Sequence, residues 1–265
     1  MDVPLWGPRN PHVLTCTLRF LRSGDAQPAF ARYAFNRSNH QMSLSFAQKI
    51  NAQSRLRVSE IFHSIQGEAD AVGWPTVFVR LTGCPLRCTW CDTAYAFEGG
   101  EWRAVDSILQ EVRGYGVRHV CVTGGEPLAQ KRCLDLLARL CDAGFQVSLE
   151  TSGALDISQV DPRVRRVVDI KAPGSGESGR NRWDNLQHLT SRDQLKFVLA
   201  DRADYDWAVA VLRERDLPSL CMVLFSPVYG ALEPRVLAEW ILQDRLPVRL
   251  QIQLHKILWG EVPGR

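Results

Sequence analysis

Short apolar runs alternate with amphipathic stretches along most of the chain after residue 57. The runs are rich in β-branched residues, and this alternation is typical of parallel-sheet proteins. The intervening stretches carry apolar residues at helical spacing, as at Val105, Ile108 and Val112, and therefore predict helices. Strands are predicted at 57–63, 76–83, 118–124, 146–151, 166–172, 194–200, 220–226 and 248–254.

The positions of polar and glycine-rich motifs favour one α/β architecture over another. TGC, TGGEP, ETSG, DIKAPGSG and SPVYG each follow directly after a predicted strand. In a βα barrel all such strand ends meet on one face, whereas an open sheet brings together only those near its switch point. Five convergent motifs therefore favour a partial (incomplete) βα barrel of about six parallel strands.

The first fifty residues read differently from the rest. They mix Pro, Arg, Asn and Ser with scattered aromatics, and no period is sustained. One hypothesis is that the functional protein begins near Met42 and that the preceding residues form a loosely held extension. The alternative is a capping or interaction segment. We therefore expect an N-terminal extension at 1–50 and one barrel domain at 51–265.

Composition and charge limit which classes of partner and which cellular compartment the protein can have. A formal net charge of +3 is too small to favour nucleic acid or an anionic membrane as the main partner. No stretch approaches the ~18 uninterrupted apolar residues of a membrane span. The N-terminus lacks the basic and apolar regions of a secretory signal. We therefore expect a cytoplasmic protein whose eight cysteines are thiols or metal ligands rather than disulfides.

Three cysteines cluster in CPLRCTWC, at Cys84, Cys88 and Cys91. A structural zinc site normally adds a fourth Cys or His with pairwise spacing, and the other cysteines have no such spacing. Most of those others fall in predicted helices and strands, where a cysteine packs as a small hydrophobe. Three thiolates suit a [4Fe–4S] cluster with one iron free of protein ligands.

The spacing CxxxCxxC after an early barrel strand resembles the radical S-adenosylmethionine superfamily. There the open iron binds S-adenosylmethionine, whose cleavage yields a 5′-deoxyadenosyl radical. TGGEP, ETSG and the D-x-K of DIK resemble segments that contact this cofactor, whereas SPVY departs from the QP-type segment of the superfamily. The resemblance implies cofactor contacts from Trp90, Gly125, Ser152, Asp169, Lys171 and Ser226.

The stretch SEIFHSIQGEADAVGWPTVFVRLTGCPLRCTWCDTAYAF (59–97) resembles the 7-carboxy-7-deazaguanine synthases. The resemblance runs from about Ser59 to the C-terminus and leaves the first ~50 residues uncovered. These lyases convert 6-carboxy-5,6,7,8-tetrahydropterin to 7-carboxy-7-deazaguanine with release of ammonia, on the route to queuosine. The resemblance implies substrate contacts from Ile65, Gln66, Gly67, Glu68, Arg80, Thr123 and His255.

The residue types fit such a substrate, and each also has a plainer explanation. Arg80 offers a bidentate fork to a carboxylate, but a surface arginine in a strand is the alternative. Glu68 can accept from the N–H groups of a pterin, or it is a solvated loop carboxylate. His255 contacts substrate or is a core histidine. The resemblance further implies Mg²⁺ at Thr93, with Asp92 as an alternative ligand.

The same resemblance implies partners beyond the substrate. An electron donor such as flavodoxin would reduce the cluster, and the family commonly forms homodimers. Two other functions stay open at this point. A radical activase of a glycyl-radical enzyme would share the cysteines, GGEP and D-x-K, but not SIQGE and Arg80. An electron-transfer module would have a fully ligated metal and no need of the glycine motifs.

Overall fold

The structure is a computed structural model that describes residues 54–262 and 264. The predicted extension, with its alternative start at Met42, lies outside the described residues, so its role stays a prediction. The described part forms one nine-stranded sheet in the order β3-β1-β2-β4-β5-β6-β7-β8-β9. The strands are β1 (Arg55–Ile65), β2 (Pro75–Leu81), β3 (Glu101–Ala104), β4 (His119–Gly124), β5 (Gln146–Thr151), β6 (Arg165–Ile170), β7 (Gln194–Leu199), β8 (Met222–Pro227) and β9 (Arg249–Leu250).

The direction of the strands divides the sheet into two parts. From β2 through β9 every neighbouring pair is parallel. In contrast, β1 runs antiparallel to both β2 and β3. The sheet ends at β3 on one side and β9 on the other and does not close on itself. The prediction of an incomplete parallel barrel is therefore confirmed.

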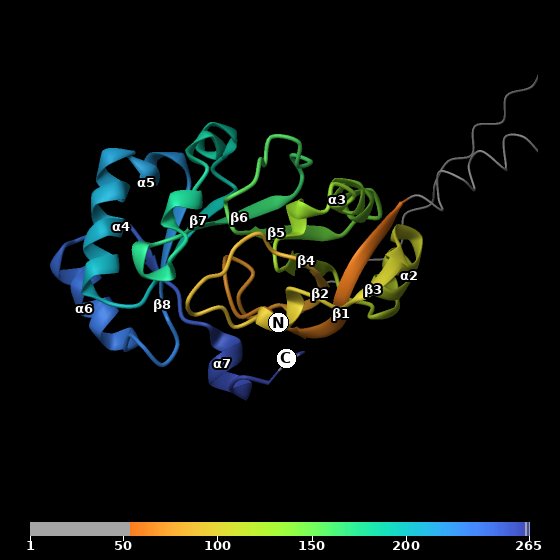
Figure 1. The fold of residues 1–265 in the computed structure, drawn as a ribbon, viewed down its shortest axis with the longest axis horizontal. Helices are drawn as coiled ribbons and strands as arrows, with labels where there is room; N and C mark the ends of the chain where they lie inside the picture. Colours follow the sequence, from red (N-terminus) through yellow and green to blue (C-terminus); the bar gives the residue numbers. More distant parts are fainter. Residues whose placement is uncertain (1–53, 263, 265) are drawn as a thin grey trace, which may run out of the picture. The chain divides into compact units, whose positions relative to one another are not determined.

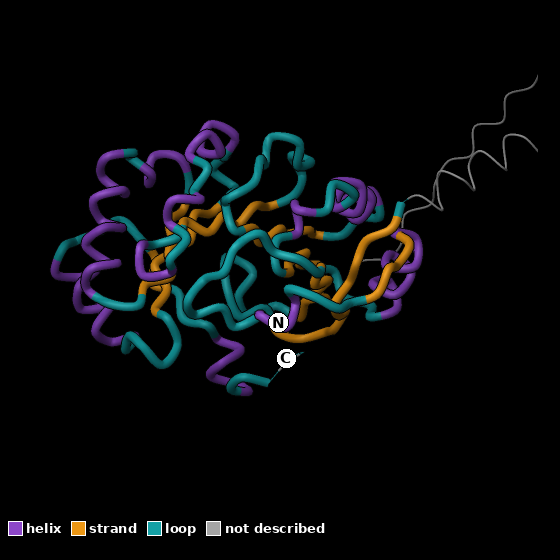
Figure 2. The backbone as a smooth tube through the Cα atoms, viewed as in Figure 1, coloured by secondary structure: helices purple, strands orange, loops and turns teal. Residues whose placement is uncertain are grey.

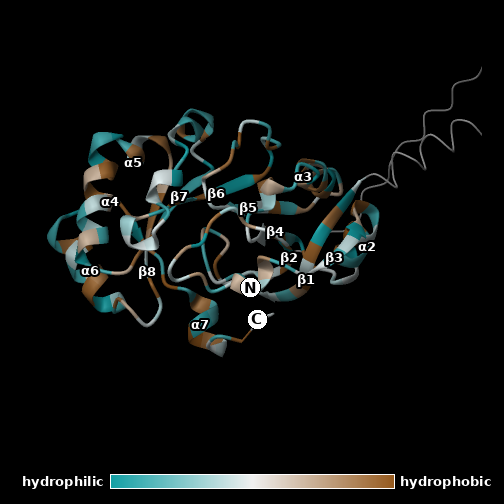
Figure 3. Ribbon diagram, in the orientation of Figure 1, coloured by the Kyte–Doolittle hydropathy of each residue, from teal (hydrophilic) through white to brown (hydrophobic). Residues whose placement is uncertain are grey.

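The helices cover the outer side of this curved sheet, while the loops that follow the strands occupy its inner side (Figures 1 and 2). Both hydrophobic and hydrophilic residues occur along α4 and α6, as expected of helices with one buried side (Figure 3). No helix within the described ranges is both long and apolar enough to cross a membrane. The helices are α2 (Val105–Gly114), α3 (Cys133–Asp142), α4 (Arg202–Glu214), α5 (Leu217–Leu220), α6 (Pro234–Gln243) and α7 (Leu254–Trp259).

The two faces of the parallel strands bury different residue types. The outer face packs the large apolar core against the helices, including Leu136, Phe197 and Tyr205. The inner face carries polar residues together with a small apolar cluster of Ala69, Val167 and Leu224. Register brings inner residues of adjacent strands together, because side chains opposite each other in parallel strands point the same way. The strands thus present their polar side chains to one inner space.

Some predicted elements differ from the observed ones. The last predicted strand, 248–254, pairs only at β9, and its end is instead the start of α7. Helical spacing is not evident there because α7 is a short helix whose Ile257 and Leu258 are exposed. The segment after β6, for which no element is predicted, holds two short 3-10 turns, Pro173–Ser175 and Ser178–Arg180.

Candidate active site

A cavity of about 640 Å³ lies on the inner side of the sheet. All five motifs that follow predicted strands contribute to its wall, so their predicted convergence is confirmed. Most of the predicted site residues line it. They are Ile65, Gln66, Glu68, Arg80, Cys84, Cys88, Trp90, Cys91, Thr93, Thr123, Gly125, Ser152, Asp169, Lys171 and His255.

Two predicted site residues do not line the cavity. Gly67 lies under His255, so closely that a Cβ on the glycine would stand 2.1 Å from Nδ1 of that ring. Its role in the structure is to let the C-terminal segment approach the loop. Ser226 is 2% exposed in β8, and the cavity is instead lined by the following Val228 and Tyr229.

The loop that carries Gln66 and Glu68 reaches the cavity from the opposite end of the strands. Because β1 is antiparallel to β2, Ile65 lies beside Pro75 at the amino end of β2. From there Gln66 Nε2 donates to Glu150 Oε1 in β5 at 3.2 Å. Thr123 Oγ1 donates to the other oxygen of Glu150, also at 3.2 Å. The two ends of the barrel therefore face one shared space.

The three clustered cysteines lie in one loop after β2 and line the cavity together. This loop is held from outside and from within: Thr89 N donates to Ser175 O in the loop after β6 at 3.0 Å, and inside the cysteine loop Arg87 Nη1 donates to Cys84 O at 2.9 Å. Burial raises the pKa of the thiols of Cys84 and Cys88, because it disfavours their thiolate forms.

The arrangement of these thiols fits a cluster better than a single ion. Among the residues that the structure describes, no three His, Cys, Asp or Glu side chains are grouped to hold one metal ion. A [4Fe–4S] cluster takes each thiolate on a different iron, so its ligands do not converge on one point. Three thiols on one cavity-lining loop can supply three of the four ligands of such a cluster.

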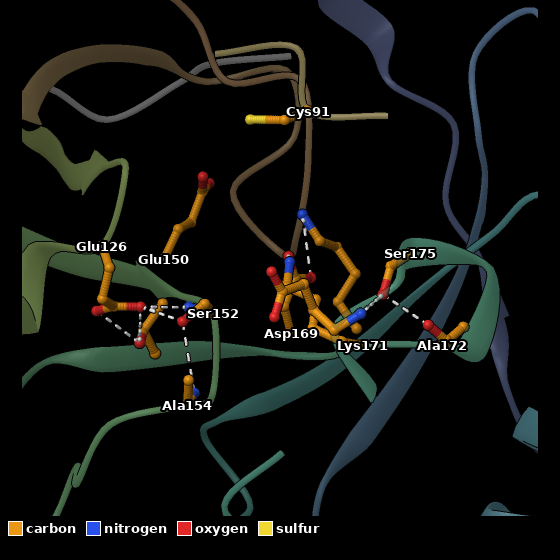
Figure 4. Close-up of polar contacts among 12 residues, drawn as sticks. Cys91, Glu126, Glu150, Ser152, Ala154, Asp169, Lys171, Ala172 and Ser175 are labelled. Carbon is orange, nitrogen blue, oxygen red and sulfur yellow. Dashed lines mark hydrogen bonds and ion pairs between the residues drawn. The ribbon is translucent and has the colours of Figure 1, made fainter. Parts of the chain in front are cut away.

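The loop after β4 packs directly on the start of the cysteine loop. Glu126 N donates to Gly83 O at 2.7 Å, and a Cβ on Gly125 would stand 2.4 Å from that oxygen. The glycines of TGGEP are thus required by loop packing. The carboxylate of Glu126, fully buried, accepts from Ser152 N at 2.7 Å and from Thr151 Oγ1 at 2.9 Å (Figure 4).

Asp169 and Lys171, at the end of β6, form a second polar pair close to the cysteine loop. Lys171 Nζ donates to Asp169 Oδ2 at 2.8 Å (Figure 4). Asp169 Oδ1 is inaccessible to solvent and has no close hydrogen-bond donor among the described residues, since Lys196 Nζ stands 3.5 Å away. A buried acceptor without a donor costs free energy unless a ligand supplies one. This side of the cavity therefore fits a polar cofactor with donors to offer.

Arg80 points into the cavity, as predicted, and is held by its neighbours. Its Nε donates to Glu60 Oε1 at 2.7 Å, and its guanidinium lies 5.7 Å from the ring centroid of Phe62. Tyr95 OH donates to the same Glu60 oxygen at 2.8 Å. Burial and the neighbouring Glu60 raise the pKa of Tyr95 to about 12. The plainer explanation of Arg80 as a surface residue is wrong.

Glu68 is buried and paired, which excludes the alternative of a solvated loop carboxylate. It accepts from Lys196 Nζ at 2.5 Å and from Gln253 Nε2 at 2.7 Å. Burial opposes ionisation, but Lys196 outweighs it and lowers the pKa of Glu68. A carboxylate is therefore maintained in the cavity wall.

Helix α7 ties the C-terminal segment to the cysteine loop. Lys256 Nζ lies 3.1 Å from Asp92 Oδ2 and 5.1 Å from the ring centroid of Tyr229. Thr93, next to Asp92, lines the cavity, and its Oγ1 lies 3.8 Å from Cys91 Sγ. The predicted alternative ligand Asp92 is thus already engaged by a cation.

Comparison with known proteins identifies the family. The model of the Radical SAM superfamily matches residues 78–171. A protein of Chlorobaculum tepidum named 7-carboxy-7-deazaguanine synthase is 46% identical over 214 residues, covering 80% of this chain and 97% of that protein. The chain belongs to the 7-carboxy-7-deazaguanine synthase family. A relative of that name from Koribacter versatilis is 41% identical over 219 residues, covering 77% and 97%.

The fold of the chain is also similar to that of a solved structure. The crystal structure of QueE from Escherichia coli has a TM-score of 0.65 and 24% sequence identity, covering 78% of this chain and 98% of that one. Membership of the Radical SAM superfamily means that the chain uses a [4Fe–4S] cluster and S-adenosylmethionine, as predicted. The shared name of the relatives favours the synthase over the activase and electron-transfer alternatives.

Sequence reasoning missed several polar residues of this synthase site: Glu60, Glu126, Glu150, Lys196, Gln253 and Lys256. One signal was available, because a lysine within the apolar run QLKFVLA is rarely buried unless it is paired. For the others no local pattern distinguishes a buried partner from a solvated side chain.

Proposed function

We propose that this chain converts 6-carboxy-5,6,7,8-tetrahydropterin to 7-carboxy-7-deazaguanine with release of ammonia, on the route to queuosine. The observation that carries the proposal is the meeting of two sets of residues in one cavity. Arg80 supplies a guanidinium that can bind a carboxylate, and Gln66 and Glu68 supply an amide and a carboxylate for the edge of the ring. The three cysteines line the same cavity. An activase acting on a large partner has no use for the first set.

The pterin half of the site is supported by its pattern of donors and acceptors. The free nitrogens of Arg80 can take the substrate carboxylate, because only Nε is used by Glu60 among the described residues. Glu68, maintained as a carboxylate, accepts from ring N–H and amino groups. The adjoining wall is formed by Ile65, Gln66 and Thr123. The side chains of Gln66 and Thr123 both donate hydrogen bonds to Glu150. His255 packs on Gly67 and covers this half.

The cofactor half lies toward the cysteines. Cys84, Cys88 and Cys91 would hold the cluster, which with S-adenosylmethionine supplies the radical that removes hydrogen from C6 of the substrate. Asp169 offers Oδ1, whose contact with Lys196 Nζ is a long one of 3.5 Å, to a polar group of the cofactor, and Lys171 fixes the other oxygen. Gly125, Ser152 and Trp90 complete this wall. The chain's task is to position both molecules and exclude water.

Magnesium is a further part of the proposal. Thr93 presents a hydroxyl to the cavity and would hold Mg²⁺ together with oxygens of the substrate. Magnesium prefers oxygen ligands and is often held by few protein groups. Because Lys256 engages Asp92, Thr93 is the better candidate of the two.

The finer statements about partners and compartment are also proposals. The chain would receive its electron from a donor such as flavodoxin, act as a homodimer and work in the cytoplasm. The last follows from a cluster and free thiols that need a reducing compartment. Gel filtration with light scattering would test the homodimer, and reduction by purified flavodoxin would test the donor.

The reaction is tested by an anaerobic assay of reconstituted protein with the pterin, S-adenosylmethionine, dithionite and Mg²⁺. We expect a product with the mass of 7-carboxy-7-deazaguanine, absent with Cys88→Ala and retained with Cys141→Ala, which changes a cysteine outside the loop. Formation of 5′-deoxyadenosine without that product would reject the pterin as substrate and revive the activase alternative.

A further inference from the structure

Lys196 is a buried cation on the inner face of β7 that neither sequence reasoning nor the proposed reaction assigns. The residue is 9% exposed and lines the cavity. Its Nζ donates to Glu68 Oε2 at 2.5 Å and lies 3.5 Å from Asp169 Oδ1. One ammonium group therefore stands between a carboxylate of the proposed pterin half and one of the proposed cofactor half.

The fold places this ammonium group rigidly. In the sheet, Asp169 of β6 lies directly opposite Lys196 of β7, so the two side chains leave adjacent strands on the same face. Glu68 comes from the loop after β1, at the other end of the barrel. Asp169 and Lys196 are therefore positioned by the sheet, and Glu68, in a loop, is held by its contact with Lys196.

The charge on Lys196 is secured by its surroundings. Burial alone lowers the pKa of a lysine, but Asp169, Glu68 and Glu150 raise the pKa of Lys196 well above its ordinary value. The pKa of Glu150, in contrast to that of Glu68, is raised, by burial and by the negative charge of Glu68. Lys196 therefore favours the ionised form of Glu68 in a cavity that would otherwise oppose it.

Glu68 has few other restraints. Besides Lys196, Gln253 Nε2 donates to Glu68 Oε1, and Glu68 N donates to Gln66 Oε1 at 3.1 Å. Both of these contacts come from loop residues. The contact with Lys196 is the only one of the three that links Glu68 to a strand of the sheet.

We propose that Lys196 is a positioning residue that, anchored beside Asp169, aims the carboxylate of Glu68 at the N–H groups of the pterin. This inference rests on the proposed function, because it assumes that a pterin occupies the half of the cavity next to Glu68. Lys196 itself acts through Glu68 and need not touch the substrate.

The test measures pterin affinity by anaerobic calorimetry on the reconstituted enzyme, together with KM and kcat. We expect Lys196→Met to weaken pterin binding at least about tenfold, as for the loss of a charge-assisted hydrogen bond. Lys196→Arg, which keeps the charge, should bind at least about three times more tightly than Lys196→Met. Lys131→Met is the matched control, since Lys131 is exposed outside the cavity, and it should bind like the wild type.

A double-mutant cycle separates positioning from a general structural effect. If Lys196 acts through Glu68, then Glu68→Gln and the double variant Glu68→Gln/Lys196→Met should bind the pterin equally, within about twofold. The double variant also removes both members of the buried pair, so it remains measurable if Lys196→Met alone fails to fold.

Three results would overturn the inference. They are unchanged binding by Lys196→Met, no recovery with arginine, or a loss from Lys196→Met that is as large in the Glu68→Gln background as in the wild type. Failure of the proposed function is a different result, because the wild-type protein would then bind no pterin, and the inference would fall with it.

Discussion

Arg80 and Glu60 form an ion pair in which Nε of the arginine donates to Oε1 of the glutamate at 2.7 Å. The two residues lie opposite each other in the antiparallel pair of β1 and β2. Tyr95 donates to the same oxygen, and among the described residues Arg80 uses only Nε as a hydrogen-bond donor. The Nη nitrogens of Arg80, which lines the cavity, are thus left for a bidentate contact with a carboxylate.

Glu60→Gln should raise the KM for the pterin by about three- to tenfold and change kcat little. The substitution removes the charge that holds Arg80 in place, and loss of one charge-assisted contact is of this size. Steady-state kinetics measure it, with Tyr95→Phe as a milder variant. A fall in KM would contradict this, since it would mean that Glu60 competes with the substrate carboxylate.

Gly67→Ala should weaken pterin binding and loosen the C-terminal segment. The added methyl group would stand 2.1 Å from Nδ1 and 2.9 Å from N of His255, so α7 has to shift. Limited proteolysis near residue 254 reports the shift, and calorimetry reports the affinity. Gly114→Ala, at the end of α2 with open space around it, should change neither. Equal behaviour of both variants would argue against the packing of His255 on the loop.

Glu126→Ala should destabilise the protein by about 2–4 kcal/mol and weaken binding of S-adenosylmethionine. The buried carboxylate accepts from Ser152 N, Ser152 Oγ and Thr151 Oγ1, and the substitution leaves these donors without a partner. Urea unfolding gives the free energy, and calorimetry gives the affinity. A variant with full stability and normal cofactor binding would show that Glu126 does not join the two loops.

Stability should fall as the pH drops below the ordinary pKa of an aspartate, about 4. Asp193 is 1% exposed, and Arg166 lowers its pKa against the opposing effect of burial, donating from Nη2 at 2.6 Å. A carboxyl group with a depressed folded-state pKa stabilises the protein above its unfolded value, and this is lost as the pH falls through the folded value.

Urea unfolding at pH 7, 5 and 3.5 measures this effect. Asp193→Asn should be less stable at pH 7 by about 3–5 kcal/mol, because it leaves Arg166 buried without its partner. Its stability should also depend less on pH between 5 and 3.5. Parallel curves for the two proteins would assign the acid sensitivity to other groups.

Alanine at any one of Cys84, Cys88 or Cys91 should remove most of the iron after reconstitution. Each thiolate would hold a separate iron, so two remaining ligands retain a cluster poorly. Iron analysis and the charge-transfer absorbance measure the loss. Cys221→Ala, which changes a buried cysteine far along the sequence, should retain the cluster. Retention by the loop variants would contradict the assignment of these ligands.

Much of the sheet was predictable because its strands are bounded by strong turn signals. The strand 146–151 agrees with β5 at both ends, since Gly144 precedes it and TSG follows. The convergence of the motifs followed from a rule of parallel topology. In contrast, the two-residue β9 could not be separated from the apolar start of α7, because both are short and lack a clear period.

The site was predictable only where a motif or a resemblance marked it. Gln66 and Glu68 were predicted as substrate contacts, but their entry from the opposite end of the barrel depends on the antiparallel pairing of β1. Lys196 was missed because its function depends on residues 128 positions away, at Glu68. Pairings over such distances are set by the way the curved sheet and its loops come together, which no local pattern encodes.

The central claim is that one cavity holds the pterin beside the cluster and cofactor. We propose that the hydrogen removed from C6 is afterwards returned to the cofactor, which regenerates S-adenosylmethionine. The most direct measurement is an anaerobic reaction in which the pterin is in large excess over S-adenosylmethionine. We predict that 7-carboxy-7-deazaguanine, followed by mass, will exceed the amount of S-adenosylmethionine supplied. No such product from protein with an intact cluster, or one 5′-deoxyadenosine released for each product formed, would contradict the account.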